Sequence, residues 1–293
     1  MNDETTTRPG PGPKRPASHR GLPAPVKHLL LLLGATAMLY PLLWMVSSSI
    51  KPTELIFREP GLWPSRVDLA NYTRGWTALG QPFQYYLYNS AVIAGLAIIG
   101  NLLTCSMAAY AFARLEFPLK KLMFGLMLGT LMLPIHVLIV PQYILFTQLE
   151  WINTSLPLVV PKFLAHDAFF IFLMVQFIRG LPRELDEAAR IDGCGHFRIY
   201  WRIVLPLCSP ALATSAVFTF IWTWNDFFSQ LIFLTDPGQY TVPVALRAFM
   251  DGEGHTAWGP LFAMSVVALA PIFGVFLAGQ RYLTQGIATT GFK

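Results

Sequence analysis

The stretch RELDEAARIDGCGHFRIYWRIVLPL, residues 183–207, concentrates charged side chains between two long apolar runs. The chain as a whole is 54% hydrophobic and only 13% charged, whereas charged residues make up about a quarter of an average soluble domain. A charged segment enclosed by apolar ones is typical of a loop that connects two membrane-spanning helices. The apolar runs on both sides of residues 183–207 therefore decide the fold class.

Six apolar runs are long enough to cross the hydrocarbon core of a bilayer, which takes roughly 20 residues of helix. They cover residues 28–50, 89–112, 122–146, 155–178, 209–234 and 259–281. The segments between them are too short to form a separate soluble domain of useful size. The sequence therefore predicts an all-α polytopic membrane protein with six transmembrane helices.

The predicted organisation has five parts. A tail over 1–26, rich in Pro, Thr and Arg, is expected to be disordered because it has few large apolar groups. The first transmembrane helix covers 27–50, an extracytoplasmic loop covers 51–84, a core of five helices covers 85–281, and a tail covers 282–293. The first apolar run is too long for a signal-peptide core and lacks a small-residue cleavage site, so we expect it to be retained.

Lys and Arg residues indicate the orientation of the chain in the membrane. When the segments between the runs are assigned alternately to the two sides, fifteen Lys and Arg residues fall on one side and five on the other. Cytoplasmic loops are enriched in these residues, so both termini and a loop over 180–207 are predicted to be cytoplasmic. Because these charges follow the membrane and form no separate patch, the sequence argues against nucleic-acid binding.

Prolines interrupt the third and fourth runs, at Pro134 and Pro141 and at Pro157 and Pro161. Proline removes a helix hydrogen bond, so we expect kinks in both helices. Kinked helices occur in membranes where neighbouring helices or a water-filled cavity satisfy the free backbone groups. The pattern fits a transport bundle that moves, and it fits a static channel equally well.

Polar residues within the runs are candidates for a solute pathway, because a buried charge in a membrane normally faces a cavity or a partner. Trp224, Asn225 and Asp226 in the fifth run combine an aromatic ring, an amide and a carboxylate, which suit a polyhydroxylated solute. His136 in the third run is a fourth candidate. Hydrogen bonding between helices explains the same residues as well as a pathway does.

The first half of the charged stretch predicts a short helix over 182–192. Pro182 suits the first turn of a helix, and the acidic residues that follow it lie near the positive end of the helix dipole. Gly193 can adopt the left-handed conformation that ends a helix. Ala188 and Ala189 leave the helix nearly bare, so that another surface can approach it closely.

A second short helix is predicted over 196–204, and Leu205 and Pro206 are expected to end it and turn the chain into the fifth run. Four residues at helical spacing form an aromatic and apolar stripe on it: Phe197, Tyr200, Trp201 and Val204. Two ordered helices with a bare face, oriented charges and an aromatic stripe favour docking into a groove on a soluble partner. A solvated loop or a helix on the membrane surface explains only part of this pattern.

The same residues resemble the hallmark of the inner-membrane permease subunits of bacterial ABC importers, which is Glu-Ala-Ala, three residues, Gly, nine residues, Ile-x-Leu-Pro. The chain has this hallmark with both spacings intact: Glu187-Ala188-Ala189, Asp192-Gly193 and Ile203-Val204-Leu205-Pro206. Cys194 replaces the more common alanine. The segments AAYAFARLEF, LPIHVLIVPQYILF and TWNDFFSQLIFLTDPGQYTVPVAL resemble the maltose-type, MalG-like branch of carbohydrate-uptake permeases.

The resemblance implies a type I ABC importer permease fold in the bacterial cell membrane and one half of a translocation pathway for a sugar or oligosaccharide. It implies three partners, namely a second homologous (MalF-like) permease, a cytoplasmic ABC ATPase dimer and an extracytoplasmic solute-binding protein. The coupling helix region over 182–206 would be seated in the ATPase. The residues that the resemblance assigns to this contact are Glu187, Ala188, Ala189, Asp192, Gly193, Ile203, Leu205 and Pro206.

The chain itself is expected to be no enzyme. It has no Gly-Lys dipeptide and hence no phosphate-binding loop, and no catalytic or metal-binding set stands out. We expect it to bind no metal or cofactor, whereas the partner ATPase would use ATP and Mg. Cys105, Cys194 and Cys208 show no metal-ligand spacing and are interpreted as small packing residues.

Two alternatives stay open. The first is a permease for glycerol phosphate or another non-sugar solute, although an anionic substrate would require basic residues in the pathway and Lys162 is the only Lys or Arg in a span interior. The second is an ion-coupled secondary transporter that uses Lys162, Asp167 and Asp226. This second alternative leaves the ordered cytoplasmic stretch unexplained.

Overall fold

The computed structural model describes residues 23–250 and 257–288, and the chain divides into two units, Met1–Leu43 and Trp44–Lys293. Most of the tail predicted over 1–26 lies outside the described residues. Helix α1 (Ala24–Ser49) begins within the last three residues of that predicted tail, starts in the first unit and ends in the second. It is apolar along its length, in agreement with the first predicted transmembrane helix.

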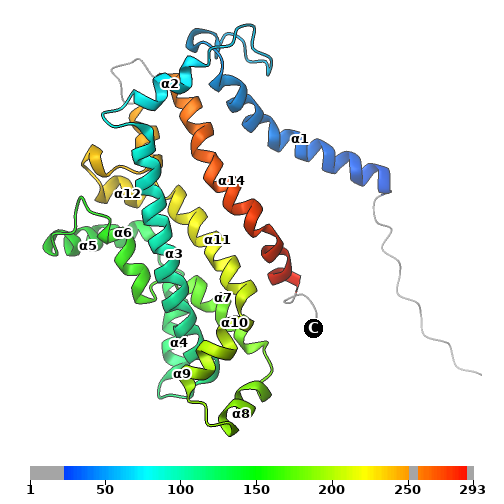
Figure 1. Cartoon of the computed structure of the whole chain (residues 1–293), viewed down its shortest axis with the longest axis vertical. Helices are drawn as coiled ribbons and strands as arrows, with labels where there is room; N and C mark the ends of the chain where they lie inside the picture. Colours follow the sequence, from blue (N-terminus) through cyan, green and yellow to red (C-terminus); the bar gives the residue numbers. More distant parts are fainter. Residues whose placement is uncertain (1–22, 251–256, 289–293) are drawn as a thin grey trace, which may run out of the picture. The chain divides into compact units, whose positions relative to one another are not determined.

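Every regular element among the described residues is a helix. Within the unit Trp44–Lys293, α3 (Phe83–Arg114) packs against α7 (Ala168–Arg179) and α11 (Ser209–Asn225), and α11 packs against α14 (Trp258–Ala288) (Figure 1). These helices are rich in apolar and small residues, which allow close contact between helices that lack polar faces. The result is a helical bundle, with α2 and α8 at opposite ends of α3.

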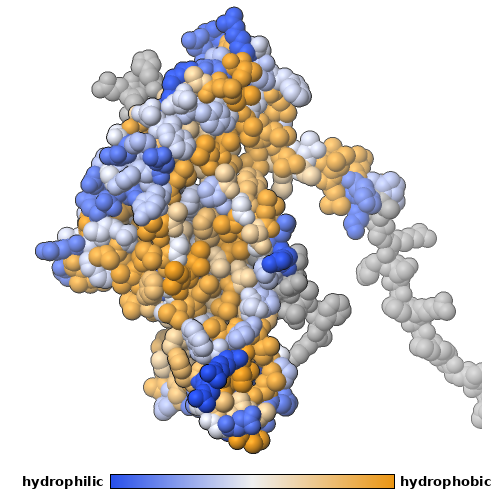
Figure 2. Space-filling model, viewed as in Figure 1, coloured by the Kyte–Doolittle hydropathy of each residue, from blue (hydrophilic) through white to orange (hydrophobic). Residues whose placement is uncertain are grey.

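Among the described residues, four helical segments are long and apolar enough to cross a membrane, and there are up to six if each of two bent helix pairs is one span. The first pair is α4 (Lys120–Thr130) with α5 (Ile135–Gln148), bent by 100°, and the second joins 196–207 to α11, bent by 76°. Apolar side chains cover much of the visible face of the bundle between its polar ends (Figure 2). The predicted all-α polytopic membrane fold is confirmed.

The third run forms two helices rather than one kinked helix. The break falls at residues 131–134, and Pro134 precedes the first residue of α5 with an extended backbone (ψ 131°). Pro141 lies inside α5. The prediction of a proline-dependent distortion is confirmed, but the bend of 100° is far larger than a kink within a continuous helix.

The fourth run is also interrupted. It consists of α6 (Leu156–Val159), a 3₁₀ segment η2 (Val160–Leu164), a left-handed residue Ala165 (φ 53°) and α7. Thr104 of α3 stabilises the break, because its Oγ1 donates to the Lys162 carbonyl oxygen (3.0 Å) and accepts from the Ala165 N–H (3.2 Å). Backbone groups that a regular helix would pair internally are thus paired with a neighbouring helix.

The fifth run ends earlier than predicted. Helix α11 stops at Asn225, and a separate short helix α12 (Phe228–Phe233) follows. The physical reason is Asp226, whose backbone is extended (ψ 98°) and whose Oδ1 accepts the Ser229 N–H at 3.1 Å. A carboxylate that caps the next helix competes with continuation of the first one.

The loop predicted over 51–84 contains the short helices η1 (Thr53–Leu55) and α2 (Ala70–Thr77). Its first residue, Lys51, is fully buried, and its Nζ donates to the carbonyl oxygens of Glu59 (2.8 Å) and Gly61 (2.5 Å). The loop therefore folds back over an ammonium group. A second loop carries η4 (Pro237–Gln239) and α13 (Val242–Ala248) before the undescribed residues 251–256.

The predicted second cytoplasmic helix is longer than expected. It runs through α9 (His196–Ile199), a π-helical turn η3 (Tyr200–Val204) and α10 (Leu205–Leu207), so the prediction that Leu205 and Pro206 end it is wrong. A proline normally clashes with the carbonyl group four residues before it. The wider π turn that precedes Pro206 moves that carbonyl aside, and the chain bends at Cys208 instead.

Candidate functional site

The first candidate site is the segment 182–206, which we call the coupling loop after the role that the resemblance implies. Its first helix, α8 (Glu184–Ile191), begins two residues after Pro182 and ends two residues before Gly193, which has a φ of 78°. The Cys194 N–H donates to the Ala189 carbonyl oxygen (2.9 Å) and the Gly193 N–H to that of Arg190 (3.0 Å). These two bonds form a Schellman cap, so the predicted helix and its glycine end are confirmed.

An ion pair holds α8 against the end of α3. Arg114 Nε lies 3.1 Å from Asp186 Oδ2, and the two side chains are only 3% and 9% exposed. Arg114 also donates from Nη2 to the Leu181 carbonyl oxygen at 2.8 Å. The Nε hydrogen is not aligned with the carboxylate, so this contact is mainly Coulombic. The sequence predicts for the acidic residues of α8 only a position near the positive end of the helix dipole, and it does not predict the contact between Arg114 and Asp186.

The inner side of the coupling loop packs into the bundle. Ala189, Ile199, Tyr200 and Val204 are buried there together with residues of α3 and α7. The Tyr200 hydroxyl lies 2.8 Å from Ser106 Oγ, and either oxygen can be the donor. The inner side of the coupling loop is therefore packed against α3 and α7.

The outer side of the coupling loop exposes large apolar groups. Ile191 is 87% and Phe197 70% exposed, and the Phe197 ring stacks on Trp201 at 6.3 Å with an interplanar angle of 12°. The predicted aromatic stripe is thus divided, since Phe197 and Trp201 face outward whereas Tyr200 and Val204 are buried. Exposed apolar groups on a rigid base are typical of a surface that binds another protein.

The predicted contact residues do not all lie on the outer side. Ala188, Glu187, Asp192, Gly193 and Pro206 are exposed. Of the remaining three, Ala189 is buried, and Ile203 and Leu205 are partly buried. Both alanines are predicted to leave the surface of α8 bare, but only Ala188 lies on that surface. Glu187 lines a cavity of about 580 Å³ between α8 and the end of α3.

The second candidate site is a cavity of about 440 Å³ that we call the membrane cavity. It forms where the fourth and fifth runs are broken, between η2, the end of α11 and the start of α5. Its lining residues are Ile135, Leu158, Lys162, Asp167, Ile221, Trp222, Thr223, Asn225 and Asp226. Broken helices that meet at a cavity are a recurrent construction of transporter solute sites.

The polar groups of the membrane cavity are partly paired with one another. Lys162 Nζ donates to Asp167 Oδ2 at 2.8 Å, so these two residues form an ion pair. Asn225 donates from Nδ2 to the Ile221 carbonyl oxygen at 2.8 Å, and its side-chain oxygen remains for another partner. With Asp226, the cavity contains one basic and two acidic side chains.

Two predicted pathway residues lie away from this cavity. Trp224 is 3% exposed and stacks on Phe220 within the bundle (ring centroids 5.2 Å apart). His136 is exposed beside Phe228, with ring centroids 4.9 Å apart. The aromatic group in the cavity is Trp222, which is not among the predicted pathway residues.

The described residues contain no group of three or more His, Cys, Asp or Glu side chains that could hold a metal ion. Cys105 and Cys208 are buried within the bundle, and Cys194 is partly buried beside it. Cys105 Sγ lies 2.8 Å from Asn101 Oδ1, in a buried polar contact within α3.

Sequence comparison shows the protein family that the chain matches. Residues 100–289 match the family described as binding-protein-dependent transport system inner membrane component. The chain is 36% identical to the probable ABC transporter permease protein YurM of Bacillus subtilis, over 90% of this chain and 87% of that protein. It is 32% identical to the trehalose/maltose transport system permease protein MalG of Thermococcus litoralis (92% and 98%) and 34% identical to the sn-glycerol-3-phosphate transport system permease protein UgpE of Yersinia enterocolitica (89% and 94%).

Structural comparison agrees with the sequence. A chain in the crystal structure of a bacterial ABC transporter involved in the import of the acidic polysaccharide alginate superimposes with a TM-score of 0.78. The match covers 92% of this chain and 99% of that chain, at 21% sequence identity. At this identity the likeness shows the fold, which is that of an ABC importer permease.

Proposed function

Because this chain belongs to the family of binding-protein-dependent transport system inner membrane components, we propose that it forms half of the translocation pathway of an ATP-driven importer and is driven by a separate ATPase through residues 182–206. It is a non-catalytic, multi-pass membrane subunit. The observation that carries the coupling proposal is the coupling loop, whose outer side is apolar and exposed while its inner side is fixed to α3.

The exposed groups at the end of the coupling loop support docking into a cleft of the ATPase. Ile191, Phe197 and Trp201 would be desolvated in the complex, whereas in water they expose a large apolar area. The Arg114–Asp186 ion pair and the Tyr200–Ser106 contact would transmit the movement of the ATPase to α3 as a rigid-body shift. ATP and Mg would be bound by that partner.

The proposed orientation has both termini and the coupling loop in the cytoplasm, in agreement with the distribution of Lys and Arg. The segment that contains α2 and the loop that contains α13 would then face the extracytoplasmic solute-binding protein. The other half of the pathway would be a second homologous permease, because one bundle of this size leaves the membrane cavity open on one side.

A neutral sugar or oligosaccharide is the substrate that the membrane cavity supports best. Trp222 offers an aromatic face, and Asn225 and Asp226 offer acceptors for hydroxyl groups. The cavity holds one basic group, Lys162, which is already paired with Asp167, so its charged side chains sum to about −1. This net negative charge would repel an anionic solute such as glycerol phosphate, although one relative is the permease protein of an sn-glycerol-3-phosphate transport system.

A different observation argues against the hypothesis of an ion-coupled secondary transporter. Lys162 and Asp167 are paired at 2.8 Å, and the chain belongs to a family of binding-protein-dependent permeases. An ion-gradient mechanism would also give no role to the ordered coupling loop.

Two substitutions test the coupling proposal. Gly193→Pro removes the N–H that caps α8 and cannot adopt a φ of 78°, and Glu187→Lys reverses an exposed charge on α8. We expect both variants to insert normally and to lose sugar uptake and sugar-stimulated ATP hydrolysis. Gly195→Ala is the control, since Gly195 has a φ of −75° and open space around its Cβ position. Normal uptake by both test variants would contradict the coupling role.

A third substitution tests the substrate cavity. Asp226→Asn removes a charge while its side-chain oxygen can still accept the Ser229 N–H, so the start of α12 is preserved. We expect uptake to fall roughly tenfold with normal assembly, as measured by transport assays and by co-purification of the subunits. Asp226→Ala should reduce uptake at least as much. If both variants instead fail to assemble, Asp226 has a structural role and the pathway assignment is wrong.

A further inference from the structure

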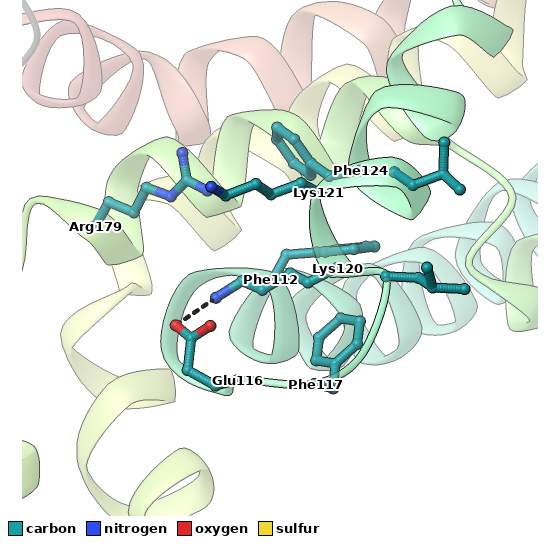
Figure 3. A pocket seen from close by; sticks show the side chains of 9 residues that line it. Phe112, Glu116, Phe117, Lys120, Lys121, Phe124 and Arg179 are labelled. Carbon is teal, nitrogen blue, oxygen red and sulfur yellow. Dashed lines mark hydrogen bonds and ion pairs between the residues drawn. The ribbon is translucent and has the colours of Figure 1, made fainter.

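A third cavity lies at the same end of the bundle as the coupling loop, and neither proposed site uses it. Its volume is about 690 Å³, and it lies between the end of α3, the start of α4 and the end of α7 (Figure 3). We call it the basic cavity. Three cations, Lys120, Lys121 and Arg179, and one carboxylate, Glu116, line it.

The charges of the basic cavity are only partly compensated. Lys120 Nζ donates to Glu116 Oε1 at 3.0 Å and to the Leu115 carbonyl oxygen at 2.6 Å. Lys121 and Arg179 have no carboxylate partner in the described part of the chain. In Figure 3 the ends of these two side chains point toward one another, an arrangement of like charges that an anion between them would stabilise.

The rest of the basic cavity is apolar. Phe112 packs against Phe117 and Phe124, with ring centroids 5.8 Å and 5.3 Å apart, and the Arg179 guanidinium lies over the Phe124 ring at 5.3 Å. Leu119, which directly precedes α4, and Leu122 on α4 are exposed at its rim, and the outer surface of α4 is apolar. A ligand for this cavity therefore combines an anionic group with attached hydrocarbon.

We propose that the basic cavity binds the headgroup phosphate of an anionic phospholipid from the adjacent membrane leaflet. Lys121 and Arg179 would hold the phosphate, and the glycerol and first acyl carbons would lie on the phenylalanine cluster and along α4. Lys and Arg residues at a membrane boundary are common and would carry no such inference by themselves. Lys121 and Arg179 differ from such residues because they converge over a cluster of phenylalanine rings at the ends of three apolar helices.

Native mass spectrometry of the purified transporter, titrated with phosphatidylglycerol or phosphatidylcholine, tests this proposal without requiring the ATPase. We expect the first phosphatidylglycerol to bind roughly thirtyfold more tightly than phosphatidylcholine, because each Lys or Arg at a membrane surface strengthens binding about fivefold. Lys121→Gln/Arg179→Gln should abolish the preference. Lys121→Arg/Arg179→Lys keeps both charges and should retain it, and so should Arg66→Gln, which removes an exposed cation from the loop that contains α2.

Three outcomes would overturn the proposal. Equal binding of the two lipids would show that the cavity does not recognise the anionic headgroup. An unchanged preference in the glutamine variant would place the lipid elsewhere. Full displacement of phosphatidylglycerol by excess inorganic phosphate would show a site for a free anion, since the acyl contacts would then contribute nothing.

Discussion

Replacing Arg114 by methionine is expected to release the coupling loop from α3 and to stop transport. Asp186 would remain buried without its cation, and the loss of one partner of a buried ion pair costs about 3–5 kcal/mol. Since each 1.4 kcal/mol is a factor of ten, the detached form of the loop should become at least about a hundredfold more populated. Limited proteolysis of inside-out vesicles should then cleave residues 182–206 much faster, and uptake should fall more than tenfold.

A double variant and a surface control separate this ion pair from a general loss of stability. Arg114→Met/Asp186→Leu removes both charges, and a well-packed apolar pair can replace a buried ion pair at little cost. It should regain much of the protease resistance that the single variant loses. Arg198→Met, which removes an exposed cation from α9, should resemble the unaltered chain. Equal protease resistance of all four proteins would show that the ion pair does not hold the loop.

Replacing Gly100 by alanine is expected to disturb the broken fourth span and the membrane cavity beside it. A Cβ atom at Gly100 would lie 2.6 Å from the Phe163 ring, which belongs to η2. Three atoms of this ring lie within 2.9 Å of the Cβ position, so we expect η2 to shift away from α3, and overpacking of this kind costs about 1–3 kcal/mol. Thr104 would then lose its hydrogen bonds to the break, and Lys162 would shift within the cavity.

Gly95→Ala is the matched control, because Gly95 lies on the same helix and has open space around its Cβ position. We expect Gly100→Ala to lower the unfolding temperature of the purified transporter and to reduce uptake, whereas Gly95→Ala should leave both near their original values. Similar results for the two variants would mean that the close approach of α3 and η2 is not needed for transport.

The features that sequence predicted well are those determined by local chemistry. Six apolar runs follow from hydropathy alone, and α8 with its cap at Gly193 follows from residue types within one short segment. The motif around Glu187 could likewise be recognised in isolation. In each case, the residues that decide the structure are close together in the chain.

The features that sequence missed depend on contacts between distant segments. Nothing in the sequence pairs Arg114 with Asp186, because each has several equally plausible partners. Trp222 and Trp224 are two residues apart, about 200° around the helix, and both faces of α11 are apolar, so hydropathy could not select the one that lines the cavity. Hydropathy does not predict that α11 ends directly before Asp226, because the apolar run continues beyond this residue.

The central claim is that a separate ATPase docks on the outer side of the coupling loop, and site-specific photo-crosslinking in native membranes tests it most directly. A photoreactive residue replaces Ile191, which is 87% exposed on α8, and, as the control, Trp63, which is 91% exposed in the loop that contains α2. Mass spectrometry of the adducts should identify an ABC ATPase from position 191 and none from position 63. Efficient labelling at position 191 with lipid or another copy of this chain, and no ATPase adduct, would contradict the account.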